Sequence, residues 1–288
     1  MKIAICVSGQ PRFTNFGATH QKKFADMLSH DVDFYVQTWT QEGVEQLAEE
    51  LFGGYKAKKV RIDTQYAPTQ FSDHFHKIRG LSQHYAHFLC QSQIENLTDY
   101  DVIIRTRHDT MINTDLMEEI EELIQKVYAE NTVAGFGFYP DYEDEPSLTV
   151  HQNEPSHRGF SQYPTFDDWA IVGHVNQWKK FDTTPEEFSK LLDEMFMDPK
   201  NEHFRSTYDL YGQEKRVCIP ELVWYNLMDL NLTKSFYVGR GYAYLARPTL
   251  RGTVGSKLVE LLTPTDVRQA LRRGWVNGAA VLQYSITI

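Results

Sequence analysis

Three charged side chains lie at the end of an apolar run in the segment 101–109, which reads DVIIRTRHD. Arg105, Arg107 and Asp109 are spaced two residues apart, so on a β-strand they would lie on one face. Guanidinium groups bind phosphates, and a carboxylate binds a metal ion or a sugar hydroxyl. The segment therefore predicts either a site for an anionic ligand or a strand end whose charges pair with each other or with a nearby helix.

A glycine-containing loop follows the first apolar run of the chain. Residues 2–8 have the composition of a β-strand and lead into SGQPR at 8–12. A strand that ends in glycine and is followed by an arginine is typical of phosphate sites, although a simple tight turn has the same composition. The sequence contains no P-loop, dinucleotide-binding fingerprint or hydrolase nucleophile elbow. The candidate nucleotide-binding residues of this loop are Ser8, Gly9, Gln10 and Arg12.

Two acidic segments in the second half are candidates for sugar binding or acid–base chemistry. Asp167 and Asp168 precede Trp169 in the segment FDDWAIVG. Carboxylates accept hydrogen bonds from hydroxyls and an aromatic ring covers an apolar sugar face, whereas the alternative is the start of a strand with a capping aspartate. Glu221 follows Pro220 at a predicted helix start, where it is either a base or ligand, or only a partner of the helix dipole.

The segment 81–96 has the apolar stripe of a helix. Gln83 lies in its first turn, where a polar side chain can point towards a ligand crevice. His84 and His87 are three residues apart, a spacing that suits two metal ligands. Because no cysteine or acidic ligand pattern accompanies them, surface or hydrogen-bonded histidines are the favoured interpretation.

The first half of the chain alternates strand and helix patterns. The predicted strands are 2–8, 32–38 and 59–62, and the predicted helices between them are 21–29 and 42–51. This alternation predicts a parallel sheet with right-handed crossovers. In an open α/β sheet the ligand crevice lies beyond the carboxyl ends of the strands, which is where the charged end of 101–109 would fall.

The second half is less regular. A strongly acidic helix with a solvated outer face is predicted at 115–130, and further helices at 185–196, 220–230 and 265–273. Strands are predicted at 133–138 and 235–238, with a short apolar run ending at 173. The segment 139–164 is predicted to be a long polar loop that acts as a lid or binds an acceptor.

Composition limits the class of protein. The chain has 288 residues and a formal net charge of −10, so one large domain is expected, and general binding to nucleic acid or to an anionic membrane is not. Its three cysteines are far apart in the sequence, so we expect each to be a small buried side chain rather than part of a disulfide. This expectation favours a reduced, cytoplasmic compartment. No secretory signal peptide or membrane-spanning run is recognised, and peripheral association with a membrane stays open.

The order of the motifs SGQPR, SQHYAHF, YDVIIRTRHD, FDDWAIVG and PELVWYN resembles that of nucleotide-sugar glycosyltransferases of the GT-A fold. It is similar above all to small bacterial and phage proteins related to WavE-type lipopolysaccharide and capsular polysaccharide synthesis enzymes. The motifs lie within residues 1–230. The resemblance implies one α/β, Rossmann-like domain over 1–288, with a mostly parallel central sheet flanked by helices. Its nucleotide-binding half would be 1–138, and 139–288 would be an acceptor-binding half with a loop-rich C-terminal extension.

The resemblance also implies a function in polysaccharide biosynthesis. The enzyme, expected to be a hexosyltransferase, would move a sugar from a UDP-, GDP- or CDP-sugar to a glycan or lipid-linked saccharide. The family binds the donor diphosphate through a divalent metal, Mn²⁺ or Mg²⁺, at a DxD motif. Asp109 matches the second acid and is the implied metal ligand. Arg107 stands in place of the first acid and can itself neutralise a diphosphate, so the sequence leaves metal dependence open.

Roles follow for the candidate residues. Asp168 and Glu221 are the candidate catalytic bases. The donor-binding candidates are Ser8, Gly9, Gln10, Arg12, Gln83, Arg105, Arg107, Asp109 and Asp167. Two alternatives stay open. One is a sugar nucleotidyltransferase, for which the loop at 8–12 is short. The other is a non-catalytic nucleotide-sugar or glycan-binding module, which the arginine at the first DxD position favours.

Overall fold

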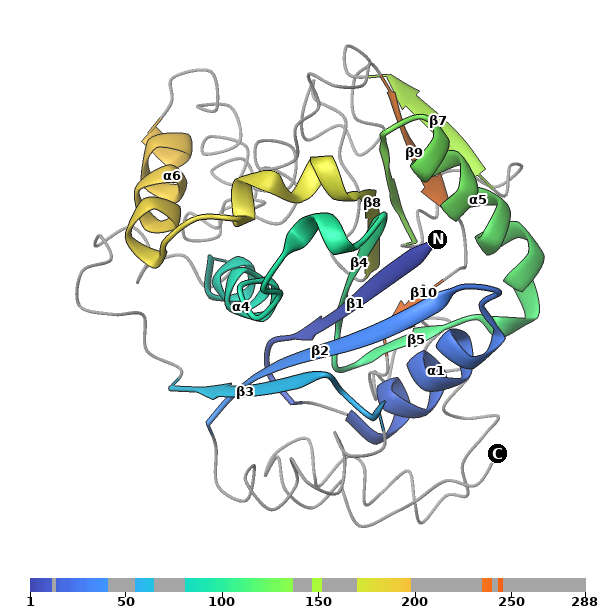
Figure 1. Cartoon of the computed structure of the whole chain (residues 1–288), viewed down its shortest axis with the longest axis horizontal. Coiled ribbons are helices and arrows are strands. Elements are labelled where there is room, and N and C mark those ends of the chain that lie inside the picture. Colours follow the sequence, from blue (N-terminus) through green and yellow to red (C-terminus); the bar gives the residue numbers. More distant parts are fainter. Residues whose placement is uncertain are drawn as a thin grey trace, which may run out of the picture.

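The computed structural model describes residues 1–11, 14–40, 55–64, 81–136, 147–151, 170–197, 235–239 and 243–245. A mixed β-sheet runs through the centre of this part of the chain (Figure 1). Its strands are β1 (Lys2–Ser8), β2 (Asp31–Trp39), β3 (Lys59–Asp63), β4 (Val102–Arg107), β6 (Val133–Gly135), β7 (Ser147–His151), β8 (Ala170–His174) and β9 (Ser235–Gly239). Their order in the sheet is β3-β2-β1-β4-β8-β6-β9-β7.

Most strands of the sheet point in the same direction. β2 is parallel to β1 and β3, β1 is also parallel to β4, and β6 is parallel to β9. Only β7 and β8 run against their neighbours among these strands. The carboxyl ends of β1, β2, β3 and β4 therefore meet at one edge of the sheet. This arrangement confirms the predicted α/β, Rossmann-like fold with a mostly parallel sheet.

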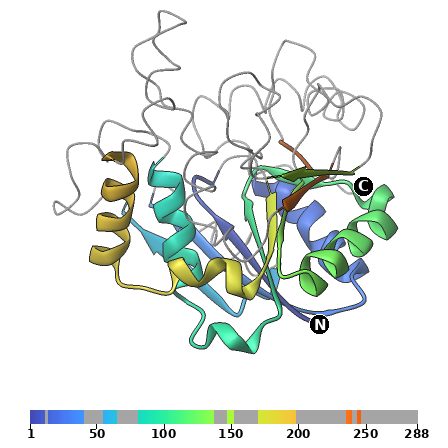
Figure 2. The same cartoon turned by 90° about the horizontal axis from the view of Figure 1, so that it is seen from above.

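Helices cover both faces of the sheet. They are α1 (Thr14–Met27), α4 (Leu81–Gln91), α5 (Met117–Ala129) and α6 (Pro185–Met197), with short 3₁₀ helices η3 (Leu97–Asp99), η4 (Thr114–Leu116) and η5 (Val175–Phe181). Figures 1 and 2 show α1 and α5 on one face and α4 and α6 on the other. In β1, the side chains of Ile3, Ile5 and Val7 join the apolar core that includes Phe24 of α1. Residues at the alternate positions of β1 and β4 consequently face α4.

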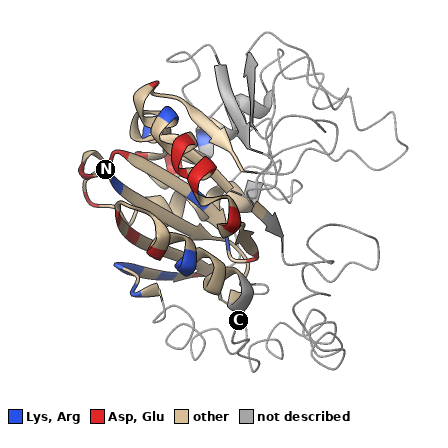
Figure 3. Ribbon diagram, turned by 90° about the vertical axis from the view of Figure 1, so that its right-hand side faces the viewer, with Lys and Arg blue, Asp and Glu red and all other residues tan. Residues whose placement is uncertain are grey.

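Helix α5 buries one stripe and exposes its acidic side chains, as predicted for a solvated helix. The stripe consists of Met117, Ile120, Leu123, Ile124 and Val127. Glu118, Glu119 and Glu122 are exposed, and Figure 3 shows acidic residues in red along the ribbon of this helix. The apolar stripe holds the helix on the sheet by burial, since this spacing places its members on one side.

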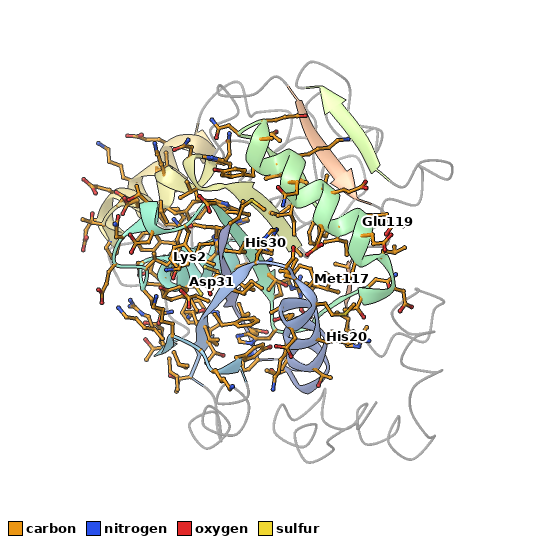
Figure 4. The ribbon with its side chains drawn as sticks, turned by 45° about the vertical axis from the view of Figure 1, so that its right-hand side comes forward. Lys2, His20, His30, Asp31, Met117 and Glu119 are labelled. Atoms are coloured by element: carbon orange, nitrogen blue, oxygen red, sulfur yellow. The ribbon has the colours of Figure 1, made fainter. Side chains whose placement is uncertain are left out.

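The amino edge of the sheet, opposite the carboxyl ends of β1 to β4, carries a polar network. Lys2 and Asp31 are register partners there and lie close together in Figure 4. The hydroxyl of Tyr100 donates to Asp33 Oδ2 at 2.6 Å and lies 2.9 Å from the hydroxyl of Tyr35. These contacts join the beginnings of β1, β2 and β4, so they serve the stability of the sheet rather than its ligand edge.

Several predicted boundaries differ from the structure. Helix α1 begins at Thr14 rather than at 21, and α4 ends at Gln91 rather than at 96. The prediction of an uninterrupted loop over 139–164 is wrong, because 147–151 form β7, which pairs with β9. The short strands β5 (Thr110–Ile112) and β10 (Ala243–Leu245), which pair with each other, were not predicted. The helices predicted at 42–51, 220–230 and 265–273 lie outside the described residues.

No helix in the described part of the chain is long and apolar enough to span a bilayer. Two of the three cysteines, Cys6 and Cys90, are fully buried, as predicted for small core side chains, and Cys218 lies outside the described residues. Burial raises the pKa of the Cys90 thiol well above its usual value.

Candidate functional site

The two segments that the sequence singles out meet at the carboxyl edge of the sheet. In the parallel pairing of β1 with β4, Ser8 is the register partner of Arg107. The glycine loop after β1 and the charged turn after β4 therefore begin side by side. Strand β8 begins at the same edge, because its first residue, Ala170, pairs with Thr106. Three segments with candidate residues thus start or end within one short stretch of the sheet.

The loop after β1 is held by β2. Gly9 has a φ of +108°, a conformation that favours glycine, and a Cβ built there would meet no heavy atom within 4 Å. Its N–H donates to Gln37 Oε1 at 3.3 Å, and its C=O accepts from Thr38 Oγ1 at 3.3 Å. Backbone conformation, rather than lack of space, therefore requires glycine at this position.

The other residues of this loop differ in exposure. The hydroxyl of Ser8 is buried and has no hydrogen-bond partner among the residues that the structure describes. Because a buried polar atom without a partner is costly, Ser8 Oγ is a candidate ligand contact. Gln10 is exposed, and Arg12 lies outside the described residues.

Gln37 connects the strand ends at this edge. Its side chain is fully buried and accepts from Gly9, while Nε2 donates to the backbone oxygen of Thr38 at 3.1 Å and to Asp63 Oδ2 at 3.2 Å. Its backbone oxygen lies 2.9 Å from Nε2 of His108, in the turn after β4. One glutamine therefore joins the carboxyl ends of β1, β2, β3 and β4.

His108 is neutral at physiological pH. Burial lowers the pKa of its imidazole to about 4, although the hydrogen bond to the backbone of Gln37 opposes this effect. The 2.9 Å contact to a carbonyl oxygen assigns the proton of the neutral ring to Nε2. His108 thus contributes a directed hydrogen bond to the site and no positive charge.

Arg107 and Asp109 form an ion pair across the turn. Arg107 Nε donates to Asp109 Oδ1 and Arg107 Nη2 donates to Asp109 Oδ2, both at 2.9 Å. The side chains are 17% and 5% exposed. The prediction that a strand continues to Asp109 is wrong, because β4 ends at Arg107 and the following turn brings the carboxylate back to the guanidinium. The sequence predicted either that these charges pair with each other or that they form a site for an anionic ligand. The charges do pair, and the pair lies at the carboxyl edge of the sheet, where a ligand site would also be expected.

Helix α1 fixes the position of this turn. Gln21 Nε2 donates to the backbone oxygens of Arg107 and Thr110, at 2.8 and 2.9 Å. Its Oε1 accepts from the hydroxyl of Tyr55 at 3.2 Å. A Cβ added to Gly17 would lie 1.9 Å from the backbone oxygen of His108, so the helix approaches the turn as closely as glycine allows.

Arg105 lies deeper in the protein. It is on the same face of β4 as Arg107, the face towards α4, and its side chain is fully buried. Burial lowers the pKa of His87 well below its usual value, and the nearby positive charge of Arg105 lowers it further. Arg105 is therefore a buried charge that affects the pKa of His87, and its direct contact with a donor stays a prediction.

The histidines of α4 are core residues. His84 and His87 are both fully buried, and the His87 ring packs against Trp178 and Phe181 with centroid distances of 5.1 and 5.0 Å. Within the described ranges no three His, Cys, Asp or Glu side chains are grouped so as to hold a metal ion. Gln83, at the beginning of α4, is half-buried.

Sequence reasoning did not single out Gln37, Asp63 or His108. A glutamine within the apolar run 32–38 was the only available signal for the first of them. Asp63 ends β3 and pairs with Arg61, whose Nε lies 2.8 Å from Oδ1. The candidates Asp167, Asp168 and Glu221 lie outside the described residues, so their roles stay predictions.

No protein-family model and no curated protein matches the chain. Among solved structures, it is similar to the galactosyltransferase LgtC in complex with donor and acceptor sugar analogues, with 13% identity, a TM-score of 0.38 and coverage of 93% of this chain and 99% of that one. For CMP-2-keto-3-deoxy-manno-octonic acid synthetase complexed with CTP the identity is 11%, the TM-score 0.42 and the coverage 95% and 98%. For a nucleoside-diphosphate-sugar pyrophosphorylase from Vibrio cholerae these values are 12%, 0.41, 84% and 94%. Likeness at this level carries no functional conclusion, and the resemblance to WavE-type enzymes stays a prediction.

Proposed function

We propose that this protein is a glycosyltransferase that moves a sugar from a nucleoside diphosphate sugar to a hydroxyl of a glycan or lipid-linked saccharide. The observation that carries the proposal is the register pairing of Ser8 with Arg107. It joins a glycine loop to a guanidinium at the carboxyl edge of a group of parallel strands. Ligands of open α/β folds bind at this edge.

The donor diphosphate is assigned to the space between these two segments. Arg107 offers N–H donors to the phosphates, and Gly9 has no side chain to keep them from the main chain. The unpartnered hydroxyl of Ser8 gains a hydrogen-bond partner when a ligand is bound. Gln10 and Arg12 continue the loop in sequence and are proposed to contact the nucleotide.

Transfer needs a base for the acceptor. A carboxylate takes the proton of the acceptor hydroxyl while the oxygen of that hydroxyl attacks the anomeric carbon of the donor sugar. The nucleoside diphosphate leaves with the electrons of the broken C–O bond. Positive charge beside the leaving diphosphate stabilises the transition state. Asp168 and Glu221 are the proposed candidates. Asp168 precedes Ala170 by two positions, and Ala170 pairs with Thr106 at this edge, which favours Asp168.

The test is incubation of the purified protein with UDP-, GDP- and CDP-sugars, with and without Mn²⁺, in the presence of candidate saccharide acceptors. The expected result is transfer, or slow donor hydrolysis, with one nucleotide class. Binding of a nucleotide sugar without turnover against any acceptor would instead indicate a binding module. Release of pyrophosphate from a nucleoside triphosphate and a sugar phosphate would indicate a nucleotidyltransferase.

A further inference from the structure

A divalent metal is the group that the resemblance to GT-A enzymes implies, and the residues described here do not fit it. We infer that the guanidinium of Arg107, oriented by Asp109, binds the donor diphosphate through its N–H groups in place of a metal ion. The inference rests on the proposed function, because it concerns the same donor site. It makes Asp109 a positioning residue rather than a metal ligand.

The first argument is the state of the Asp109 carboxylate. Both of its oxygens accept hydrogen bonds from one guanidinium, at 2.9 Å each, and its side chain is only 5% exposed. A metal ion bound to this carboxylate would have to share oxygens that already accept those N–H groups, and it would lie beside a permanent positive charge. The ion pair therefore uses the very atoms that the second acid of a DxD motif offers to a metal.

The second argument is that the guanidinium is held in a defined place. Gln21 binds the backbone oxygens on either side of the turn, and Gly17 brings α1 against the backbone of His108. Asp109 fixes the plane of the guanidinium through two parallel hydrogen bonds. A charge that is already oriented before the reaction needs no reorganisation as the leaving group becomes negative.

The third argument concerns the other groups around the turn. His108 is neutral, since burial lowers its pKa to about 4, so Arg107 supplies the positive charge of the turn itself. In the part of the chain that the structure covers, no group of three metal-ligating side chains lies near the turn or elsewhere. The chemistry available at the end of β4 is therefore that of a guanidinium.

The experiment measures binding of UDP, GDP and CDP to the wild-type protein by calorimetry, once in EDTA and once in Mn²⁺. We expect one nucleotide to bind with the same affinity in both buffers. Arg107→Ala should weaken that binding by about tenfold to a hundredfold, the range of a hydrogen bond to a charged group. Arg107→Lys should restore only part of it, because an ammonium lacks the planar fork. Lys59→Ala, which removes the same charge from an exposed position on β3, should bind like wild type.

Asp109→Asn separates the two roles of the carboxylate. It keeps the shape of the side chain but removes the charge that orients Arg107, so binding in EDTA should weaken by less than in Arg107→Ala. Mn²⁺ alone, followed by electron paramagnetic resonance, should show the same binding to wild type and to Asp109→Asn. Thermal unfolding of each variant establishes that it is folded before its binding is compared.

Different outcomes overturn different claims. Nucleotide binding that requires Mn²⁺, or Mn²⁺ binding that Asp109→Asn abolishes, would refute the inference and leave the proposed glycosyltransferase intact. Unchanged affinity in Arg107→Ala would also refute it. Absence of nucleotide binding in both buffers would remove the proposed function, and the inference with it.

Discussion

Replacement of Gly17 by alanine tests whether α1 sets the position of the charged turn. The added Cβ would lie 1.9 Å from the backbone oxygen of His108, 2.9 Å from its carbonyl carbon and 3.2 Å from the backbone oxygen of Thr110. Real Cβ atoms essentially never come closer than 3.0 Å, so helix and turn must separate by the difference between 1.9 and 3.0 Å. Because the opposing atoms belong to the backbone, no side-chain rotation can relieve the contact.

Two energies oppose each other in this variant. Overpacking that moves backbone costs about 3 kcal/mol at the upper end of its usual range. The higher helix propensity of alanine compared with glycine offsets about 1 kcal/mol of this cost. The free energy of unfolding should therefore fall by about 2 kcal/mol, which lowers Tm by roughly 5 °C for a protein of this size. Displacement of Arg107 by about 1 Å should also reduce donor-dependent turnover by about 10²-fold.

The assay is urea unfolding followed by circular dichroism, together with the donor turnover measurement. The matched control is the pair Lys22→Ala and Lys22→Gly, at an exposed position of α1, which measures the helix-propensity difference in the same helix. Equal or higher stability of Gly17→Ala relative to wild type would show that the turn yields without cost. In that case the argument that α1 positions Arg107 would be refuted.

Three further predictions concern other parts of the molecule. The pKa of His108 is about 4 in the folded state, against 6.5 for the free side chain. Below pH 6.5 the unfolded chain therefore binds a proton that the folded protein does not. The free energy of unfolding should fall by about 3 kcal/mol between pH 6.5 and pH 4. His108→Gln should reduce this loss in urea titrations, and an unchanged pH dependence would contradict the assignment. Tyr100→Phe removes the hydrogen bond to Asp33 at the amino edge and should lower the free energy of unfolding by about 1–2 kcal/mol without weakening nucleotide binding. Alanine at the true base, Asp168 or Glu221, should reduce the transfer rate by about 10²-fold or more, so full activity in both variants would exclude them.

The sheet and the meeting of the two main motifs could be predicted from the sequence. Alternating strand and helix patterns placed 2–8, 32–38 and 59–62 in one parallel sheet, and the charged end of 101–109 was expected at the carboxyl ends of its strands. That rule brings both motifs to one edge, whereas the pairing of β1 with β4, which makes Ser8 and Arg107 neighbours, is seen only in the structure. The ion pair at the turn was one of two predicted alternatives, because opposite charges two residues apart on a strand end are within reach of each other.

The remaining features depend on contacts between distant segments. Strand β5 has three residues, too few for a recognisable period, and is formed by pairing with β10 at 243–245. The burial of Arg105 depends on distant segments that pack on β4, such as η5, which a local pattern does not contain. The role of Gln37 depends on its reach to Gly9 and Asp63, 28 and 26 residues away. Glycine at 17 gives no signal in the sequence until the turn that lies against it is known.

The pairing of Arg107 with Asp109 has a consequence for how an anion reaches the site. The pair carries no net charge, so it adds little long-range attraction for a diphosphate, and the chain as a whole carries −10. Attraction begins only at short range, where the guanidinium and the phosphate oxygens are in contact. The association of a dianionic donor is therefore expected to lack electrostatic steering. Added salt should raise its association rate slightly, because salt screens the repulsion from the acidic surface. If the proposed donor binds here, we expect its affinity to come from slow dissociation rather than from fast association.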